Sequence, residues 1–472
     1  MRMKKSILFI CLPSTLGVYQ SSKISIAIPS IPLISLAQLS AVSREASYTP
    51  LVLDLSIRKK EPFQKRIIKA IKECNPEYCG ITFTTTLSEE AESIAKLIKT
   101  LNPRIKIISG GPHSSIMPKE VLNGSFDIAV IGEGEITLKN ILLQKPFKSI
   151  KGIAYKEKNK IKINPPQELI ENLDSLPMPD YSVFNIKEYH TPRINCKKNP
   201  IAAIETSRGC VYNCIYCNNK VFGRCFRAKS AKRTVDEIEH ILKFGFKEIH
   251  VWDDGFSTDL NRAKDICKEI LKRKLKVTWN IYNGLRVDRI DRELLFLLKK
   301  SGCYRISLGV ESGNQSILNR INKGTKVEDI KKAFKIANEV GIDTVAFCII
   351  GLPDETEETM KQTIDLILEI KPTLAKVSIL MPFPGTPIFE EWSKSGNIIS
   401  THWTDYVFHM PKKVYNHPNL KWETINEYYA LFYRKVMLNP EFLFRRFIRG
   451  IKNGELLIDT YYFLKTIKYG WK

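Results

Sequence analysis

Short apolar runs alternate with amphipathic stretches along most of this 472-residue chain, and this rhythm limits its fold more than any other feature. In the first 146 residues, buried strands are expected at 6–11, 51–54, 78–83, 106–109 and 128–131. Apolar runs of this length are typical of parallel strands that are covered on both faces. Helical periodicity fills the intervals at 33–46, 63–73, 87–101 and 136–143. We therefore expect a doubly wound α/β domain over residues 1–146.

Five parallel strands with helices between them indicate the flavodoxin-like, Rossmann-type arrangement. The run at 6–11 follows two lysines, but no small-residue cleavage site closes it, so we interpret it as a strand and not as a signal peptide. Residues 147–198 interrupt the alternation. Runs at 152–155 and 160–163 predict a small hairpin, and the proline-rich segment at 177–181 predicts a linker.

The alternation restarts at residue 199 and continues to residue 396. Six strands are expected at 201–206, 248–252, 276–281, 304–308, 344–350 and 376–380. Helical patterns occur at 235–244, 260–273, 292–300, 327–340, 357–370 and 388–393, and their expected N-caps include Thr86 in the first domain, Thr234 and Thr325. Because a closed barrel has eight βα units, six units predict a partial (β/α)6 barrel of the TIM type. The aromatic and basic residues 397–472 predict a small helical region with helices at 422–438 and 441–452.

Three cysteines follow the first expected barrel strand. Cys210, Cys214 and Cys217 have the spacing C-x3-C-x2-C, and Tyr216 directly precedes the last of them. Active sites of βα barrels lie at the C-terminal ends of the strands, where this triplet stands. Three thiolates can hold three irons of a 4Fe–4S cluster and leave the fourth iron open to another ligand. The alternatives are buried structural cysteines or a zinc site that uses Cys225, eight residues further on.

This loop and the later strand ends resemble those of the radical S-adenosylmethionine enzymes. The resemblance implies that the three cysteines hold the cluster as its metal ligands. It also implies that S-adenosylmethionine binds the open iron and is cleaved to a 5′-deoxyadenosyl radical. The residues expected to bind S-adenosylmethionine are Tyr216, Asp253, Asp254, Glu311, Ile349 and Gly351. No further catalytic residue is assigned.

The strand ends depart from the family pattern in places. Asp253 and Asp254 stand where the family commonly has Gly-Gly-Glu, and either carboxylate is a candidate for the amino group of S-adenosylmethionine. Glu311 is the candidate for the ribose hydroxyls, with capping of the following helix as its alternative role. Phe347 and Asp354 replace the first glycine and the last glutamate of the family's G-x-I-x-G-x-x-E motif.

Glycines and threonines gather in the loops after strands three, four and five of the first domain. No G-x-G-x-x-G follows its first strand, so a dinucleotide is not indicated. The layout resembles the cobalamin-binding domain that precedes many radical S-adenosylmethionine enzymes. The resemblance implies cobalamin contacts from Thr84, Thr85, Gly110, Gly111, Pro112, His113, Gly132 and Glu133. Because the D-x-H-x-x-G motif is absent, His113 is expected to contact the loop or the corrin side chains and not the cobalt.

These resemblances imply an enzyme that methylates an unactivated carbon through a 5′-deoxyadenosyl radical and methylcobalamin. Cyclisation or rearrangement with the same cofactors is the alternative. A methylthiotransferase would need a second cluster, for which Cys11, Cys74 and Cys79 are available, although their flanks do not resemble that family. A non-enzymatic alternative is a basic RNA-binding protein with a structural cluster.

Charge and cysteine content bear on partners and location. The formal net charge is +23, but the lysines are spread along the chain, which favours a solvated surface over a nucleic-acid site. The odd number of cysteines, 11, favours a reducing cytoplasm. Residues 442–449 mix phenylalanines and arginines, which is typical of a helix at the inner face of an anionic membrane, or of a helix packed on the barrel with solvated arginines. The expected partners are a small-molecule or lipid-like substrate and an external one-electron reductant of the flavodoxin or ferredoxin type.

Overall fold

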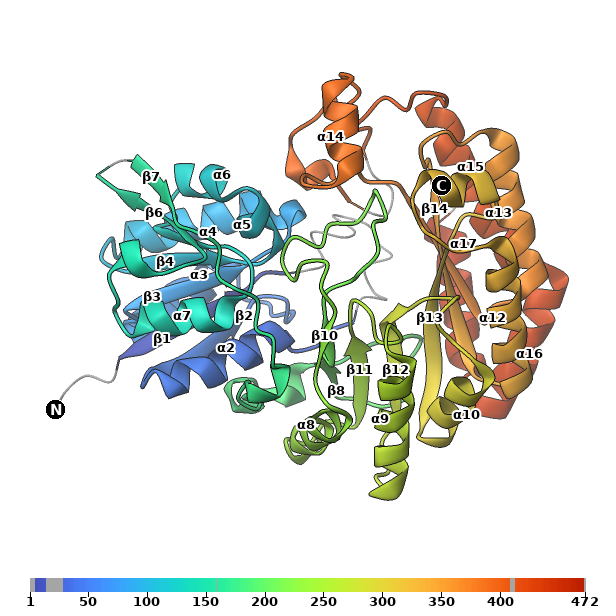
Figure 1. The fold of residues 1–472 in the computed structure, drawn as a ribbon, viewed down its shortest axis with the longest axis horizontal. Coiled ribbons are helices and arrows are strands. Elements are labelled where there is room, and N and C mark those ends of the chain that lie inside the picture. Colours follow the sequence, from blue (N-terminus) through green and yellow to red (C-terminus); the bar gives the residue numbers. More distant parts are fainter. Residues whose placement is uncertain (1–4, 14–28, 159, 408–411, 471–472) are drawn as a thin grey trace.

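The computed structural model describes residues 5–13, 29–158, 160–407 and 412–470. Figure 1 shows two α/β units side by side, with the C-terminal helices at the far side of the second unit. Residues 1–4 and 14–28 of the predicted first domain, and residues 408–411 and 471–472 of the predicted C-terminal region, lie outside the described residues.

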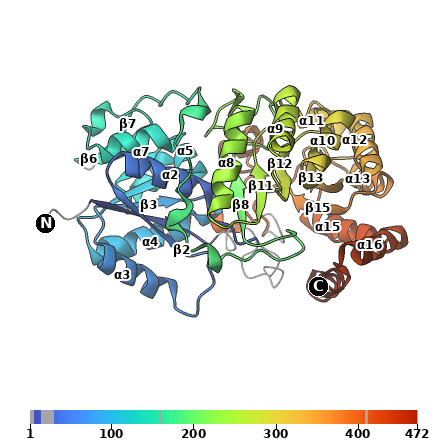
Figure 2. The same ribbon diagram turned by 90° about the horizontal axis from the view of Figure 1, so that it is seen from below.

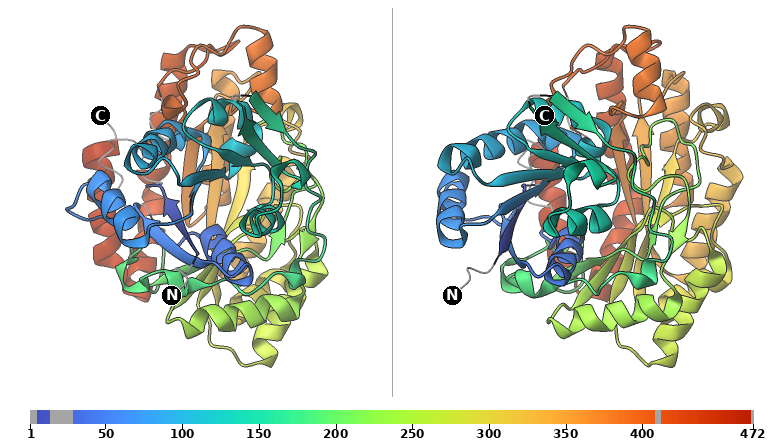
Figure 3. Two further views of the ribbon diagram at one scale, coloured as in Figure 1. Left: turned by 90° about the vertical axis from the view of Figure 1, so that its left-hand side faces the viewer. Right: turned by 60° about the vertical axis from the view of Figure 1, so that its left-hand side comes forward.

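The first unit contains the predicted doubly wound sheet. Its parallel strands have the flavodoxin-like order β2-β1-β3-β4-β5, with bounds β1 Ser6–Cys11, β2 Thr49–Asp54, β3 Tyr78–Thr82, β4 Lys106–Gly110 and β5 Ile128–Val130. The helices are α2 Ile34–Glu45, α3 Phe63–Cys74, α4 Ser88–Leu101, α5 Pro112–Ile116, α6 Pro118–Asn123 and α7 Gly134–Leu142. Side chains of β1 alternate between the two faces: Ile7 and Phe9 pack on one side, and Leu8 and Ile10 on the other. Figure 3 shows this helix-covered sheet in front of the second unit.

The predicted hairpin belongs to the same sheet. Strands β6 Ile153–Glu157 and β7 Lys160–Ile163 extend it beyond β5 in antiparallel pairing. The sheet therefore has seven strands, because β6 pairs with the edge of β5 that the parallel strands leave open.

The second unit is the predicted open barrel. Its six parallel strands follow the chain order, with bounds β8 Ile201–Ile204, β11 Glu248–Trp252, β12 Trp279–Leu285, β13 Cys303–Glu311, β14 Asp343–Ile350 and β15 Leu374–Ile379. The helices are α8 Ala231–Lys243, α9 Leu260–Lys272, α10 Arg292–Lys300, α11 Gln315–Arg320, α12 Val327–Val340, α13 Glu357–Ile370 and α14 Pro387–Lys394. Figure 2 shows α8 to α13 in a row along the outer side of the sheet. No pairing joins β15 to β8 among the described residues, so the barrel stays open.

The predicted threonine caps are wrong. Helix α8 begins three residues before Thr234, and the side chain of Ser230 accepts from the backbone N–H of Arg233. Helix α4 follows a short 3-10 turn, Thr85–Leu87, that contains Thr86. Helix α12 is preceded by Lys326 and not by Thr325. Each threonine has the expected spacing to a glutamate, but the chain enters the helix elsewhere.

The C-terminal region covers the open edge of the barrel sheet. Helices α15 Trp422–Met437 and α16 Pro440–Asn453 were expected, and a third helix, α17 Leu456–Gly470, follows them. The hydroxyl of Tyr433 in α15 lies 3.3 Å from the backbone N and 3.1 Å from the carbonyl O of Val377 in β15. It thus satisfies backbone groups that an edge strand would otherwise expose. None of the described helices has the length and apolar character needed to cross a bilayer.

A buried ion cluster joins the two units. Arg208 donates to Glu133 at 3.1 Å, to Glu135 at 2.5 Å and to Glu205 at 2.6 Å. Arg227 also donates to Glu133, at 2.8 Å. The glutamates at 133 and 135 follow β5, whereas the two arginines sit on the short paired strands β9 Ser207–Arg208 and β10 Arg227–Ala228. These strands close the loop that carries the three cysteines, so the cluster fixes that loop against the first unit.

We predict that Arg208→Met strongly destabilises the full chain, because it removes the cation that pairs with Glu135 and Glu205 and leaves Glu133 with Arg227 alone. Breaking a buried pair in this way costs about 3–5 kcal/mol. The measurement is urea unfolding followed by circular dichroism. Arg224→Met, at an exposed position of the same loop, is the matched control and should leave the transition close to that of the wild type. Equal losses for the two variants would contradict a structural role for the cluster.

Candidate active site

The cysteine loop lies between β9 and β10 and is held by the ends of barrel elements. The backbone N–H of Gly209 donates to the carboxylate of Asp254 at 3.0 Å, and that of Ile215 donates to the carbonyl of Ile321 at 3.1 Å. These bonds attach the loop to the segment after β11 and to the end of α11. The sequence therefore folds the three cysteines onto the C-terminal face of the barrel, where the resemblance expects them.

The base of the loop requires glycine. Gly209 has φ +80°, and a Cβ atom there would lie 2.2 Å from the carbonyl oxygen of Cys225. The Cys225 side chain itself is exposed. Among the residues that the structure describes, no three Cys, His, Asp or Glu side chains converge on a position for a single metal ion. A four-iron cluster binds each cysteine through a different iron, so its ligands need not converge on one point.

The three thiols affect one another. Desolvation raises the pKa of Cys214. Desolvation, and then the neighbouring Cys214 and Cys210, raise the pKa of Cys217 to about 12, although part of its surface is exposed. Three thiolates this close together need a compensating positive charge, which cluster irons supply. The donor set thus fits a 4Fe–4S cluster.

Glu311 occupies a strained strand end beside the cysteine loop. Its φ is +63°, and its side chain folds back so that Oε1 would lie 2.4 Å from a Cβ atom on Gly309. The carboxylate pairs with Lys323 at 2.6 Å, and Lys323 lies 3.5 Å from the hydroxyl of Tyr216. Burial opposes the charge of Lys323, but Glu311 outweighs it and raises the lysine's pKa. Backbone strain of this kind is concentrated at functional sites. The alternative role of capping the next helix is taken by Asn314.

The two aspartates after β11 have different surroundings. Asp253 is buried, and its oxygens accept from the N–H of Thr206 at 2.6 Å, from its hydroxyl at 2.5 Å and from the hydroxyl of Ser207 at 2.7 Å. Asp254 is exposed, and desolvation by the surrounding chain raises its pKa. Asp253 is therefore committed to holding the tip of β8, and Asp254 is the better candidate for an incoming ammonium group.

Glu355, one residue after the position of the motif's glutamate, organises the turn after β14. Glu355 accepts from the N–H of Gly351 at 2.7 Å and from that of Leu352 at 3.0 Å. It is fully buried, and burial raises its pKa to about 8. Asp354, which stands in place of the motif's glutamate, is exposed and pairs with Arg320. Gly351 has φ +79°, which favours glycine at this turn.

The C-terminal edge of the first sheet faces the cysteine loop. A Cβ atom on Gly132 would lie 3.7 Å from the carbonyl oxygen of Val221 in that loop. At the neighbouring strand ends, Thr84 is exposed, and a Cβ atom on Gly110 would meet nothing within 4 Å among the described residues. The exposed hydroxyl of Thr84 and the backbone of Gly110, which carries no side chain, leave room at this edge for a large planar group such as cobalamin.

Other predicted cobalamin residues have protein partners. His113 is fully buried: Nδ1 lies 3.3 Å from the hydroxyl of Thr85, Nε2 lies 3.6 Å from Glu120, and the ring packs edge-on against Trp403. Glu133 belongs to the ion cluster described above. Gly111, at φ +91°, precedes α5, whose first residue is the exposed Pro112. His113 and Glu133 therefore serve the joint between the units.

Comparisons with known proteins agree with this layout. Residues 204–367 match the family model of the Radical SAM superfamily, and residues 30–142 match that of the B12 binding domain. An uncharacterized methyltransferase of Pyrococcus horikoshii is 30% identical over 439 residues, which cover 89% of this chain and 93% of the relative. The chain belongs to the cobalamin-binding radical S-adenosylmethionine enzymes. Its cofactors are a 4Fe–4S cluster, S-adenosylmethionine and cobalamin.

This radical S-adenosylmethionine enzyme has further relatives of known type. The anaerobic magnesium-protoporphyrin IX monomethyl ester cyclase of Cereibacter sphaeroides is 30% identical over 340 residues, which cover 69% of this chain and 55% of the relative. The fold is similar to that of the radical S-adenosylmethionine methyltransferase TsrM from Kitasatospora setae. That match has a TM-score of 0.70 at 20% identity and covers 83% of this chain and 76% of the other.

We predict that Glu355→Gln changes how stability depends on pH. The folded protein keeps a proton on Glu355 up to a pKa of about 8, whereas the unfolded chain loses it near the ordinary value of a glutamate. The folded state therefore binds more protons between these values, and this group makes wild-type stability fall as pH rises. Glutamine cannot ionise, so the variant should gain in melting temperature relative to the wild type between about pH 5 and about pH 8.

Thermal unfolding in a series of buffers measures this difference. Glu358→Gln, an exposed position three residues further on, is the control and should run parallel to the wild type at every pH. A constant offset between Glu355→Gln and the wild type would show that Glu355 is already ionised in the folded protein.

Proposed function

We propose that this enzyme transfers a methyl group to an unactivated carbon of a small-molecule substrate. The approach of the cysteine loop to the glycine-rich edge, seen at Val221 and Gly132, supports this activity most directly. When bound, S-adenosylmethionine at the cluster supplies the radical that removes a hydrogen atom, and cobalamin supplies the methyl group. A substrate between the loop and the edge would meet both cofactors in one site.

The roles of individual side chains follow from their contacts. We assign the cluster to Cys210, Cys214 and Cys217, S-adenosylmethionine to Tyr216, Asp254, Glu311, Ile349 and Gly351, and cobalamin to Thr84 and Gly110. Lys323 compensates the charge of Glu311 and holds the Glu311 carboxylate beside Tyr216. The lysine ammonium lies 2.6 Å from the carboxylate and 3.5 Å from the Tyr216 hydroxyl. Glu355 holds the turn at Gly351 in shape through its two backbone hydrogen bonds.

Two alternative reactions differ in their support. Cyclisation with the same cofactors is favoured by the similarity to the Cereibacter sphaeroides cyclase. Methylthio transfer is disfavoured by the cysteines of the first unit. Cys11 lies at the end of β1 beside Thr82, whereas Cys79 lies beside Leu8, three residues lower in the register. Three residues of strand span about 10 Å, so these two thiols lie at different heights of the sheet.

Electrons for the cluster are expected from an external flavodoxin- or ferredoxin-type donor. A cavity of about 360 Å³ opens beside Cys217, and Lys220 and Arg224 line it. Cations around the entrance favour the approach of an acidic donor. We also propose a cytoplasmic location, which the eleven free cysteines support.

We predict that Cys214→Ala abolishes cluster assembly and all turnover. The test is anaerobic reconstitution with iron, sulfide and cobalamin, followed by S-adenosylmethionine with a deuterated methyl group, a chemical reductant and a small-molecule extract of the native host. The wild type should bind about four irons, release deoxyadenosine and pass the label into a product. Cys225→Ala, at the exposed cysteine of the same loop, should retain all three properties.

The products distinguish the reactions. If deoxyadenosine forms together with an unlabelled, cyclised product, the activity of the enzyme is cyclisation and not methylation. Full activity in the Cys214→Ala variant would contradict the assignment of the cluster.

We also propose that α16 and α17 meet a membrane surface through apolar side chains. The arginines of α16 are not solvated as expected: Arg446 pairs with Asp459, and Arg449 pairs with Asp343. The exposed side chains are apolar instead, with Phe444 65% exposed, Phe447 51%, Ile451 56% and Leu457 84%. Apolar patches of this kind on a surface mark contact sites, and aromatic side chains suit the membrane interface.

We predict that the wild type floats with phosphatidylcholine vesicles and that phosphatidylglycerol adds little, because the arginines face the protein. The double variant Phe444→Ser, Phe447→Ser should stay at the bottom of the gradient. Phe296→Ser, at a 56% exposed position on α10, should float like the wild type. Failure of the wild type to float would contradict this proposal, and a dimer lost in the double variant would assign the surface to a second copy of the chain.

A further inference from the structure

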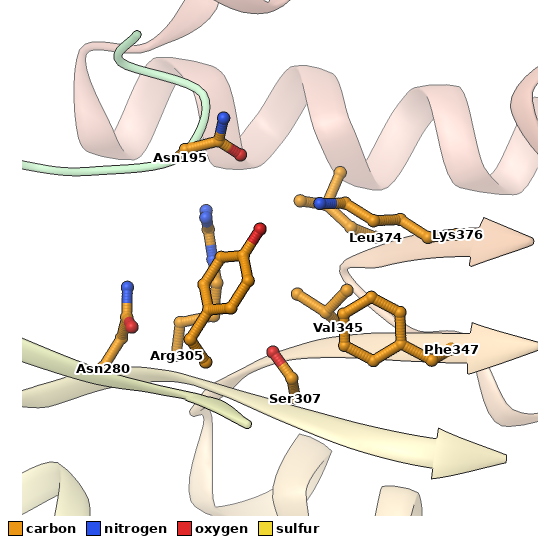
Figure 4. Close-up of a pocket in the computed structure, with 9 residues that line it drawn as sticks. Asn195, Asn280, Arg305, Ser307, Val345, Phe347, Leu374 and Lys376 are labelled. Carbon is orange, nitrogen blue, oxygen red and sulfur yellow. The ribbon is translucent and has the colours of Figure 1, made fainter. Parts of the chain in front are cut away.

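The interior of the open barrel holds a narrow cavity below the cysteine loop. Its enclosed volume is about 10 Å³, and three of its lining side chains, Tyr282, Phe347 and Lys376, are only half-buried. Side chains from β12, β13, β14 and β15 line it together with Asn195 from the linker. Arg305 and Lys376 reach it from different strands, and Asn280 stands beside Arg305 (Figure 4). Most of these residues belong to the N-terminal halves of their strands, so the cavity forms the floor of the barrel.

Two cations line this cavity without a carboxylate. Arg305 is 9% exposed and donates from Nη1 to the carbonyl of Ile194 at 3.0 Å. The ammonium of Lys376 lies over the rings of Tyr282 and Phe347, 5.7 and 5.9 Å from their centres. Neither cation is within ion-pair distance of any carboxylate that the structure describes. Arg305 is buried and Lys376 is half-buried. A cation withdrawn from water normally has such a partner, because an uncompensated charge is costly there.

Two buried lysines of the barrel have carboxylate partners: Lys229 pairs with Glu237 at 2.8 Å and Lys323 with Glu311 at 2.6 Å. The buried Arg66 of the first unit instead donates to two backbone carbonyls, those of Ile57 and Asp54. The buried carboxylate of Glu248, on β11, does not serve the cavity. It accepts from the Tyr304 hydroxyl at 2.7 Å and from the backbone N–H groups of residues 197 and 198 at 2.8 and 2.7 Å. The cavity thus differs from the two buried lysine sites of the barrel.

Polar atoms without partners gather on β12 and β13 and on the adjacent strand β11. Within the described structure, buried atoms that lack a hydrogen bond include Nδ1 of His250, Nε1 of Trp252, Oδ1 of Asn280 and Nε of Arg305. The His250 ring stacks on Tyr282, which also lines the cavity, with 6.1 Å between ring centres. Native interiors leave few polar atoms unsatisfied, and a cluster of them indicates a missing ligand or water. This observation is independent of the charges.

The strand register gives the height of the cavity below the cofactor site. Lys376 pairs with Phe347, and Ser378 pairs with Ile349. Two residues of parallel strand span about 7 Å, and the four residues from Phe347 to Gly351 span about 13 Å. A molecule whose charged end lies between Arg305 and Lys376 would therefore present a carbon roughly 10 Å away to the residues assigned to S-adenosylmethionine.

We propose that Arg305 and Lys376 bind the anionic group of the substrate, a carboxylate or a phosphate-type oxyanion, while its planar or apolar body lies along Tyr282 and Phe347. Arginine offers a fork of donors to such a group, and lysine adds a point charge. This inference rests on the proposed function and specifies its substrate class: an elongated anion whose reactive carbon lies away from its charge.

Calorimetric titration of the full-length enzyme, without reductant or turnover, tests the inference. The probes are benzoate, phenylphosphonate and the neutral benzamide. At least one of the two anions should bind roughly tenfold more tightly than benzamide, a difference typical of one charge-assisted contact. Lys376→Met should lose at least this factor for the anion. Lys361→Met, on the outside of α13, is the control for removing one positive charge and should bind like the wild type.

Arg305→Lys provides a second variant that keeps the charge but loses the fork, and an unchanged circular dichroism melting curve verifies its fold. It should bind the anion more weakly than the wild type. The inference is overturned if benzamide binds as tightly as the anions or if neither anion binds. It is also overturned if both Lys376→Met and Arg305→Lys bind the anion like the wild type. The preferred anion identifies the type of oxyanion. Because no turnover is involved, a failure here leaves methyl transfer untouched, and a failure of methyl transfer leaves the binding result standing.

Discussion

The carboxylate of Glu133 is the interaction on which the rest of the structure depends. It accepts from Arg208 and Arg227 at the base of the cysteine loop and from the backbone N–H of Ile170 in the linker. One side chain therefore ties together the first sheet, the linker and the loop. Because charges buried this deeply must stay paired, the loop has little freedom to move relative to the cobalamin-binding edge.

The two ends of the barrel carry different kinds of polar side chains. At the C-terminal end, Glu311 and Asp354 share an unusual φ of +63°, and buried carboxylates and a lysine shape the strand tips around the cysteine loop. At the floor, Arg305 and Lys376 have charge but no carboxylate. Strained backbone and perturbed acids suit the binding of cofactors of fixed shape. Unpaired cations suit a ligand that brings the opposite charge.

The same balance of charge explains the C-terminal helices. The chain carries 73 basic and 50 acidic residues, so its basic side chains outnumber the available carboxylates. In α16, Arg446 and Arg449 nevertheless reach acidic partners on α17 and β14, and the helix turns Phe444 and Phe447 outward as a result. Ion pairs, and not the apolar face, decide which side of this helix meets the protein. That choice produces the exposed apolar surface.

The amino-acid sequence by itself determined the two α/β units, the open barrel and the cysteine triplet. These features depend on residues close together in the chain: apolar runs, helical periodicity and the spacing of three thiols. It did not reveal the role of Glu133, the partnership of Lys323 with Glu311, or the organisation of the Gly351 turn by Glu355 in place of Asp354. It also misjudged three helix caps and the direction of the α16 arginines. Burial and pairing decide those features, and the partners of Glu133 lie 75 and 94 positions away in the chain, so only the tertiary structure brings them together.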